Sequence, residues 1–275
     1  EALERARRFL ADWRGHALVV PALAPHAPDT LDDAALAAVL DMAEQADAPV
    51  LIHLAETAAE GEAIRARGGL SPVAHLDRLG LLGPRLVAAH CIHVDAGDIA
   101  LLADRRVGVA HNAVANAKAA KGVAPLPAMR AAGVKLGLGT DGPMSGNTLD
   151  VIGQLGFVAK LHKLMAGDRT AMPARDVVAM ATIGGAEALG MADRIGSLES
   201  GKRADIAIVD ATGAHMTPFH DPYAALVYAA HAGDVRTMIV DGRVVVEDRR
   251  LLTADSEAIK AAANGRRSAV LAALP

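Results

Sequence analysis

The sequence has little cysteine, no long apolar run and no excess of basic residues, and each scarcity excludes a class of protein. Cys91 is the single cysteine among 275 residues, so no internal disulfide can form, and a reducing compartment such as the cytoplasm fits. No apolar run approaches the roughly 18 residues of a membrane-spanning helix. With 28 basic and 32 acidic residues the formal net charge is −4, which argues against a nucleic-acid partner. We therefore expect a cytoplasmic protein that acts on neither membranes nor nucleic acids.

Aromatic residues are also scarce. They make up 2% of the chain, whereas hydrophobic residues as a whole make up 52%. The core must therefore be built from alanine, valine, leucine and isoleucine. A chain of this length can form one large domain, or one domain with an appendage, around a sizeable core.

Short apolar segments alternate with helical patterns along the first two thirds of the chain. Alternation of this kind predicts βαβ units and a parallel sheet. Five segments are expected to be strands: Ala17–Ala24, Pro49–His53, Arg85–His90, Arg106–His111 and Val134–Gly139.

A polar residue of a catalytic type ends or closely follows each expected strand. In a parallel barrel the carboxyl ends of the strands converge on one face, where the chemistry of such enzymes lies. Taken alone, His53 could be a satisfied core histidine and Glu56 a helix-capping acid. Core histidines, however, have no reason to gather at strand ends, so the recurrence favours a functional site. The five residues are His26, His53, His90, His111 and Asp141.

The pattern changes after Leu189. Ala204–Asp210 is expected to be a strand, and Asp241-Gly242 indicates a β-hairpin between two further strands. A terminal helix is expected over Ser256–Leu274, weakened by Asn264-Gly265. These boundaries predict three parts: a barrel portion at 1–190, a small β domain at 191–253 and a terminal helix at 254–275.

Five ordered motifs resemble the amidohydrolase superfamily. Within it they are most similar to the cytosolic deaminase branch, which holds the S-adenosylhomocysteine/methylthioadenosine deaminases and their triazine-hydrolase and guanine-deaminase relatives. The resemblance implies an α/β fold, a (β/α)8 TIM-barrel hydrolase present here as strands four to eight, plus part of a small β-sandwich domain. The motifs are IHLAE at 52–56, AAHCIH at 88–93, VAHN at 109–112, LGTDG at 138–142 and IGSLESGKRADIAIVD at 195–210.

The resemblance also implies roles for individual residues. His53 would bind a divalent metal, and Asp141 would bind it too and accept a proton from the water. Glu56 would carry protons to the substrate ring, and His90 would orient the nucleophilic water. The substrate-binding residues would be His26 and Asn112.

A bound metal makes chemical sense of these residue types. Zinc can lower the pKa of water from about 15.7 to about 7, whereas the lone Cys91 cannot build a cysteine-ligated zinc site. We expect one divalent ion, zinc with Fe²⁺ as the alternative. None of the 11 histidines forms the H-x-H pair of the family's first strand. We therefore expect two further histidine ligands from a segment upstream, with this chain as part of a longer enzyme.

The function implied is hydrolytic deamination of an aminated purine nucleoside, such as methylthioadenosine or S-adenosylhomocysteine, with release of ammonia. One alternative is hydrolysis of another amino- or chloro-heterocycle: guanine, 8-oxoguanine or a triazine. Another is a metal-free scaffold of the same fold. Relatives often have P-x-S-N where this chain has Ala113–Asn116, which bears on the choice of substrate. The resemblance is also compatible with a homo-oligomer.

Two further features receive ordinary interpretations. Gly137–Gly142 formally matches G-x-G-x-x-G, but Asp141 would place a carboxylate against a dinucleotide pyrophosphate, so this interpretation is disfavoured. Five histidines outside the motifs are interpreted as ordinary surface or core residues: His75, His162, His215, His220 and His231.

Overall fold

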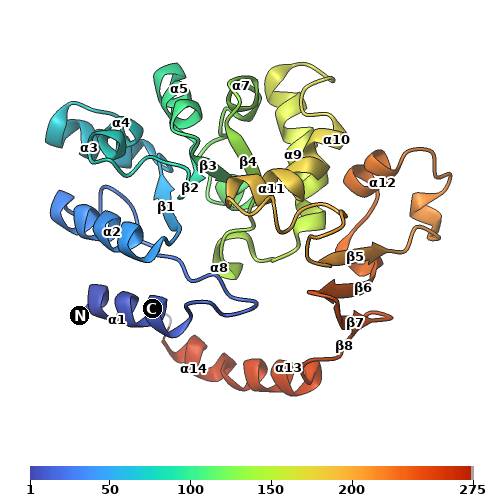
Figure 1. Ribbon diagram of the computed structural model, residues 1–275. Coiled ribbons are helices and arrows are strands. Elements are labelled where there is room, and N and C mark those ends of the chain that lie inside the picture. The colour runs from blue at the N-terminus through green and yellow to red at the C-terminus, as the bar shows by residue number, and fades with distance from the viewer. Residues whose placement is uncertain (274–275) are drawn as a thin grey trace.

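A four-stranded parallel sheet forms the centre of the protein. The computed structural model describes residues 1–273, and the strands of this sheet follow one another in chain order (Figure 1). Leu54 pairs with His90, and His111 pairs with Leu138, so the strands are in register at their carboxyl ends. The strands are β1 (Val50–Leu54), β2 (Leu86–His90), β3 (Gly108–His111) and β4 (Lys135–Leu138).

Helices cover the outer side of this sheet (Figure 1). Each of the first four begins at a side chain that accepts a backbone N–H of its first turn: Asp32, Thr57, Ser71 and Asp95. Such caps satisfy N–H groups that have no partner inside the helix. The helices are α2 (Asp33–Ala46), α3 (Ala58–Gly68), α4 (Pro72–Arg78), α5 (Ala96–Asp104), α7 (Leu126–Ala131) and α9 (Val151–Ala166).

The core lies between the sheet and these helices, and it is aliphatic as the composition predicted. Its largest fully buried apolar side chains are Leu36, Leu54, Ile64, Leu76, Leu86, Leu102, Leu126 and Met129. Burial of this kind of surface stabilises the fold by about 25 cal/mol per Å².

The expected strand at Ala17–Ala24 is wrong. Only Leu23 pairs there, in an isolated parallel bridge with Val50. The backbone N–H groups of Leu18 and Val19 instead donate to Nδ1 of His16, and a proline at position 21 has no N–H to offer. A five-strand sheet is thereby reduced to four strands and one bridge.

Several helices also differ from expectation. The sequence predicts one helix over 173–189, but the chain forms α10 (Ala174–Met180) and α11 (Ile183–Ala188). The break lets two glycines approach β4 closely: a Cβ on Gly184 would lie 2.7 Å from the Leu136 carbonyl oxygen. Three short helices were not expected: α6 (Ala113–Lys118), α8 (Pro143–Gly146) and α12 (Pro222–Tyr228). The helix expected at the start is α1 (Ala2–Asp12).

A second, antiparallel sheet follows in the chain, beside the first (Figure 1). The expected hairpin joins β6 to β7, and both of its turn residues have positive φ, 49° for Asp241 and 78° for Gly242. The strands are β5 (Ile206–Val209), β6 (Val235–Val240), β7 (Arg243–Glu247) and β8 (Arg250–Leu251).

The terminal helix is interrupted near the weak point that the sequence indicated. It forms as α13 (Ser256–Gly265) and α14 (Arg267–Ala272), both without buried residues. The end expected at Leu274, and Pro275 after it, lie outside the described residues. The three-part division at 190/191 and 253/254 stays a prediction. Within residues 1–273, no helix is both long and apolar enough to cross a membrane.

Candidate active site

Three of the expected site histidines lie together at the carboxyl end of the parallel sheet. The ring of His53 stacks on that of His90, with centroids 5.4 Å apart and planes at 22°. The ring of His26 lies 5.1 Å from that of His53. The in-register pairing of β1 with β2 produces this cluster, because it places both histidines at the same edge of the sheet.

Hydrogen bonds fix which nitrogen each of the first two rings presents. Nδ1 of His53 donates to the backbone carbonyl of His26 over 2.7 Å, so its Nε2 keeps a lone pair. The Thr30 hydroxyl donates to the Ala27 carbonyl, so its oxygen accepts from Nδ1 of His26 at 2.9 Å. Both rings therefore offer Nε2 as an acceptor or ligand.

His90 is held in the same tautomer but is more deeply buried. Its Nδ1 donates to Oδ1 of Asn116 over 2.7 Å. Burial lowers the pKa of His90, opposed by that hydrogen bond and by the charge of Glu56, so the ring is neutral at pH 7. Its Nε2 is buried without a hydrogen-bond partner and lies 3.3 Å from Oε1 of Glu56. Two acceptors that face each other leave a place for a donor such as water.

Two residues that the sequence analysis missed hold Glu56. The ammonium of Lys121 contacts Oε1 of Glu56, a contact between positions 65 residues apart. The carboxylate of Glu60 accepts the N–H groups of Ala55 and Glu56 over 2.8 and 2.7 Å. Thr57 and Glu60 have the T-x-x-E spacing of a capping box, so a sequence signal for Glu60 existed. No sequence signal pointed to Lys121.

Asp141 follows β4 at the same edge. Its φ of 58° is left-handed, and its Oδ1 accepts the N–H of Gly142 over 2.6 Å. It lies near enough to His90 for its charge to raise the pKa of that ring. Ala55, His90 and Cys91 also have positive φ, so strained backbone gathers at these strand ends, as it often does at functional sites.

The residues at this edge fit a divalent transition metal. His53 offers a free Nε2 and Asp141 offers a carboxylate, and the ring of His90 stacks on that of His53. Imidazole and carboxylate suit zinc or Fe²⁺. Two protein ligands are fewer than the three of a usual catalytic zinc site. Among residues 1–273, one group of three His, Cys, Asp or Glu side chains has its ligand atoms within 4.8 Å of one another. That group lies beside the second sheet and not at this site.

The remaining strand-end residues belong to the interior. His111 is fully buried, and its Nε2 lies 3.0 Å from Nε2 of His162. Burial lowers the pKa of His111 to about 3 and that of His162 to about 4. Asn112 is buried against Gly139, where a Cβ would lie 2.1 Å from Oδ1 of Asn112. His111 therefore acts as a core residue, whereas a substrate role for Asn112 stays a prediction.

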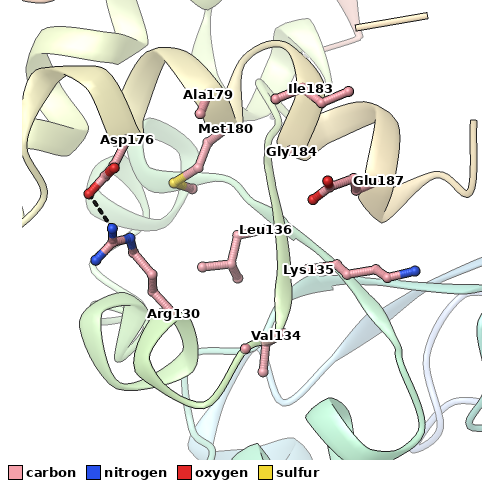
Figure 2. A pocket seen from close by; sticks show the side chains of 11 residues that line it. Arg130, Val134, Lys135, Leu136, Asp176, Ala179, Met180, Ile183, Gly184 and Glu187 are labelled. Carbon is pink, nitrogen blue, oxygen red and sulfur yellow. Dashed lines mark ion pairs between the residues drawn. The ribbon is translucent and has the colours of Figure 1, made fainter. Parts of the chain in front are cut away.

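A pocket of about 210 Å³ lies away from these residues, between β4 and helices α7, α10 and α11 (Figure 2). Arg130 and Asp176 form an ion pair of 2.6 Å beside it. Val134 and Lys135, at the beginning of β4, line it. It contains none of the expected site residues and is therefore not the candidate active site.

Comparisons with known proteins agree with the geometry. The model of the Amidohydrolase family matches residues 1–245. A 5-methylthioadenosine/S-adenosylhomocysteine deaminase from Syntrophobacter fumaroxidans is 47% identical over 255 residues, 91% of this chain and 58% of the relative. A zinc-bound adenosine deaminase from Xanthomonas campestris has a TM-score of 0.95 at 39% identity, over 98% of this chain and 61% of that one. An atrazine chlorohydrolase from Arthrobacter aurescens TC1, complexed with zinc, has a TM-score of 0.88 at 27% identity, over 96% of this chain and 60% of that one. The chain thus spans less than two thirds of these proteins.

Proposed function

Because this chain belongs to the amidohydrolase family, we propose that it contributes to the metal-dependent hydrolytic deamination of an adenosine-type nucleoside, with release of ammonia. The observation that carries the proposal is the stacked pair of His53 and His90, in which the unpartnered Nε2 of His90 lies 3.3 Å from Oε1 of Glu56. The deaminase relative and the adenosine deaminase support the substrate class. Methylthioadenosine and S-adenosylhomocysteine are the first candidates.

The residues of the site divide the chemistry among them. His53 and Asp141 would hold the metal, which supplies Lewis acidity that lowers the pKa of bound water to about 7. The lone pair on Nε2 of His90 accepts a hydrogen bond from the attacking water and so orients it. Asp141 accepts the proton that the water loses. Glu56 delivers a proton to the ring nitrogen, because attack of the water on the adjacent carbon pushes an electron pair onto that nitrogen. The proton taken up by Asp141 passes to the amine, which leaves as ammonia.

The finer architecture is also part of the proposal. We infer that β1 to β4 correspond to strands five to eight of a (β/α)8 barrel, and that the Leu23 bridge marks the fourth. The second sheet would be part of a small β-sandwich domain. Two further histidine ligands would complete the metal site, since His53 and Asp141 alone are fewer than the three protein ligands of a usual catalytic zinc site. Cytoplasmic location and a homo-oligomer stay predictions from the sequence.

The test is ammonia release by the metal-loaded full-length protein. Adenosine, methylthioadenosine, S-adenosylhomocysteine and guanine are offered, and atrazine tests dechlorination, which the chlorohydrolase neighbour makes the second candidate. We expect ammonia from an adenosine analogue and its loss in Glu56→Gln. Chloride from atrazine without ammonia from any nucleoside would replace the proposal by the second candidate. No turnover of any compound, with metal bound, would refute both.

A further inference from the structure

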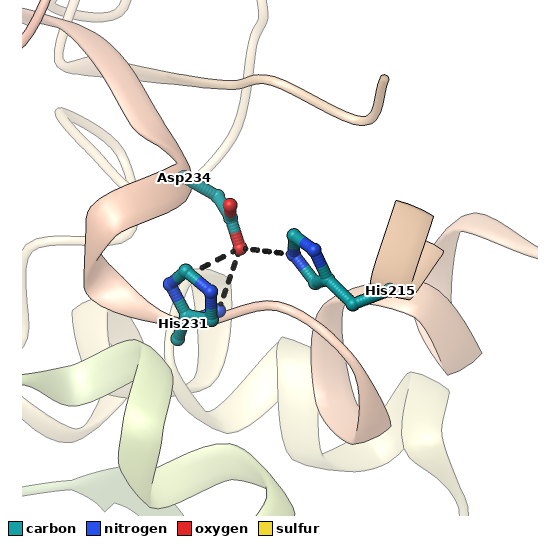
Figure 3. A group of neighbouring side chains, drawn as sticks. All are labelled: His215, His231 and Asp234. Atoms are coloured by element: carbon teal, nitrogen blue, oxygen red, sulfur yellow. Dashed lines mark hydrogen bonds and ion pairs between the residues drawn. The ribbon is translucent and has the colours of Figure 1, made fainter. Parts of the chain in front are cut away.

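Two histidines and an aspartate converge beside the second sheet, far along the chain from the residues described above. His215 lies in a 3-10 turn, η1 (Ala214–Met216), and His231 precedes a second one, η2 (Ala232–Asp234). Asp234 ends η2 directly before β6. Figure 3 shows both rings directed at the Asp234 carboxylate. From the sequence, both histidines were interpreted as ordinary surface or core residues, because a sequence does not show that their side chains lie close together.

The three side chains share a single focus. Nε2 of His215 lies 3.0 Å from Oδ2 of Asp234, and Nδ1 of His231 lies 3.4 Å from the same oxygen. The rings are stacked, with centroids 4.8 Å apart and planes at 16°. All three ligand atoms lie within 4.8 Å of one another. Two imidazoles therefore aim one nitrogen each at one point beside one carboxylate.

The two separations from the Asp234 carboxylate, 3.0 and 3.4 Å, match those between ligand atoms of a metal site. With metal–ligand bonds of about 2.0–2.1 Å, neighbouring ligand atoms of a tetrahedral zinc site lie about 3.3 Å apart. In the metal-free form, Nε2–H of His215 donates to Oδ2 of Asp234 over 3.0 Å. A divalent cation needs a lone pair on that nitrogen and on Nδ1 of His231, which each neutral ring provides when its proton is on the other nitrogen.

The surroundings leave room for the rings and access for an ion. A Cβ on Gly213 would lie 2.5 Å from the His215 ring, and one on Gly233 would lie 3.2 Å from Nδ1 of His231. The two histidine side chains are 40% and 62% exposed, whereas Asp234 is 8% exposed. The aspartate is thus a fixed ligand, and the open side of the site faces water.

Neighbouring groups hold the aspartate in place. Oδ2 of Asp234 accepts the backbone N–H of His231 over 3.0 Å, and the Asp234 carbonyl accepts the N–H of Asp210 over 2.8 Å. The carboxylate of Asp210 forms an ion pair of 3.1 Å with Arg249, so its negative charge is already neutralised. The negative charge left for a cation is that of Asp234.

We propose that His215, His231 and Asp234 form a second site for a divalent transition metal of the zinc type, with water completing the coordination. Two imidazoles and one carboxylate favour zinc, nickel or copper over magnesium or calcium, which prefer oxygen ligands. The bound ion joins η1 to the beginning of β6 and so stabilises the second sheet. This site does not depend on the proposed deaminase activity.

The test measures zinc on the full-length protein carrying His53→Asn and Asp141→Asn, which remove two of the four proposed ligands of the metal site at the other sheet, and it compares this background with the same protein carrying His231→Ala as well. We expect this background to bind one zinc per chain by calorimetry and to melt at a higher temperature with zinc. Adding His231→Ala should abolish both effects. Loss of a group that only hydrogen-bonds to a metal ligand weakens metal sites about 10–100-fold, so loss of a ligand should weaken zinc binding at least about 100-fold.

A matched control and a second probe keep the outcome unambiguous. His220→Ala removes an exposed histidine that lies outside the cluster and should leave zinc binding unchanged. Cobalt added in place of zinc should give the visible absorption of a low-symmetry site with nitrogen ligands, and His231→Ala should remove it. His231 is largely exposed, so this variant is expected to fold even where His215→Ala does not. The proposal would be refuted if the protein carrying His53→Asn and Asp141→Asn bound no zinc, or if adding His231→Ala left its zinc binding unchanged. The three side chains would then form hydrogen bonds and ion pairs only.

Discussion

Nδ1 of His90 donates a hydrogen bond to Oδ1 of Asn116 over 2.7 Å, in the buried layer beneath the candidate active site. This one contact fixes the tautomer of His90 and leaves its Nε2 as an acceptor. Asn116 lies in helix α6, which was not expected from the sequence, so an unpredicted helix orients a proposed catalytic group.

Asn116→Ala should therefore impair turnover more than substrate binding. A hydrogen-bond partner that orients a histidine of a metal site is typically worth about 10–100-fold in activity, so we expect kcat to fall by that factor with little change in KM. Asn116→Asp keeps an oxygen for Nδ1 to donate to and should recover much of the activity. Steady-state kinetics of the full-length protein, on the nucleoside that it deaminates in the ammonia-release test, checks this. A wild-type kcat for Asn116→Ala would mean that His90 needs no orientation.

The contact between Lys121 and Glu56 supports a second prediction. Oε1 of Glu56 contacts the ammonium of Lys121 and lies 3.3 Å from Nε2 of His90. The other carboxylate oxygen, Oε2, is left for the substrate. Lys121→Met should lower kcat about tenfold, an expected barrier increase of about 1.4 kcal/mol, because the carboxylate loses its orientation. The effect on stability should stay at about 1 kcal/mol or less, as for other solvent-accessible ion pairs.

Lys118→Met is the matched control, because Lys118 binds the Met144 carbonyl and not Glu56. Both kcat and the free energy of unfolding are measured for each variant. A rise in activity of Lys121→Met would reverse the interpretation, since the lysine would then compete with substrate for Glu56.

A third prediction concerns the turn that carries Glu56. The Glu60 carboxylate accepts two consecutive backbone N–H groups there, and burial raises its pKa against the effect of those hydrogen bonds. Glu60→Gln replaces one accepting oxygen with an NH2 group that faces a donor. An unsatisfied buried N–H costs about 1–3 kcal/mol, so the urea unfolding free energy should fall by that amount. Glu62→Gln, on the same helix but exposed, should change it little.

The parallel strands could be predicted from the sequence because they are short, nearly continuous apolar runs such as Val50–Leu54, which is typical of parallel sheets, although Leu51 is exposed. The site histidines could be predicted because parallel strands in register place their ends together. The strand expected at 17–24 failed for a local reason: the imidazole of His16 takes the N–H groups that a strand would use.

Contacts between distant segments escaped prediction. Lys121 meets Glu56, and His215 meets His231, only after the chain has folded, and no local pattern encodes either meeting. His111 shows the opposite error. It ends a strand like His53 and His90, but α9 places His162 against it and makes it part of the core.

The buried pair of His111 and His162 gives the last prediction, a pH dependence of stability. Their pKa values fall from 6.5 to about 3 and about 4 on folding, because burial disfavours the charged ring. Between the folded and unfolded values the unfolded chain binds more protons, so stability rises with pH. The contribution of the two neutral rings to the free energy of unfolding is complete above pH 6.5 and is lost as pH falls toward 4, at up to about 1.4 kcal/mol per pH unit for each ring.

In His111→Gln/His162→Gln, where the two amides can still hydrogen-bond, the slope of the urea unfolding free energy against pH between pH 6 and 5 should decrease accordingly. His220→Gln, which removes an exposed histidine, should leave the slope unchanged. An equal slope in the double variant and the wild type would mean that the pair takes up protons in the folded state, which would contradict its burial as a neutral pair.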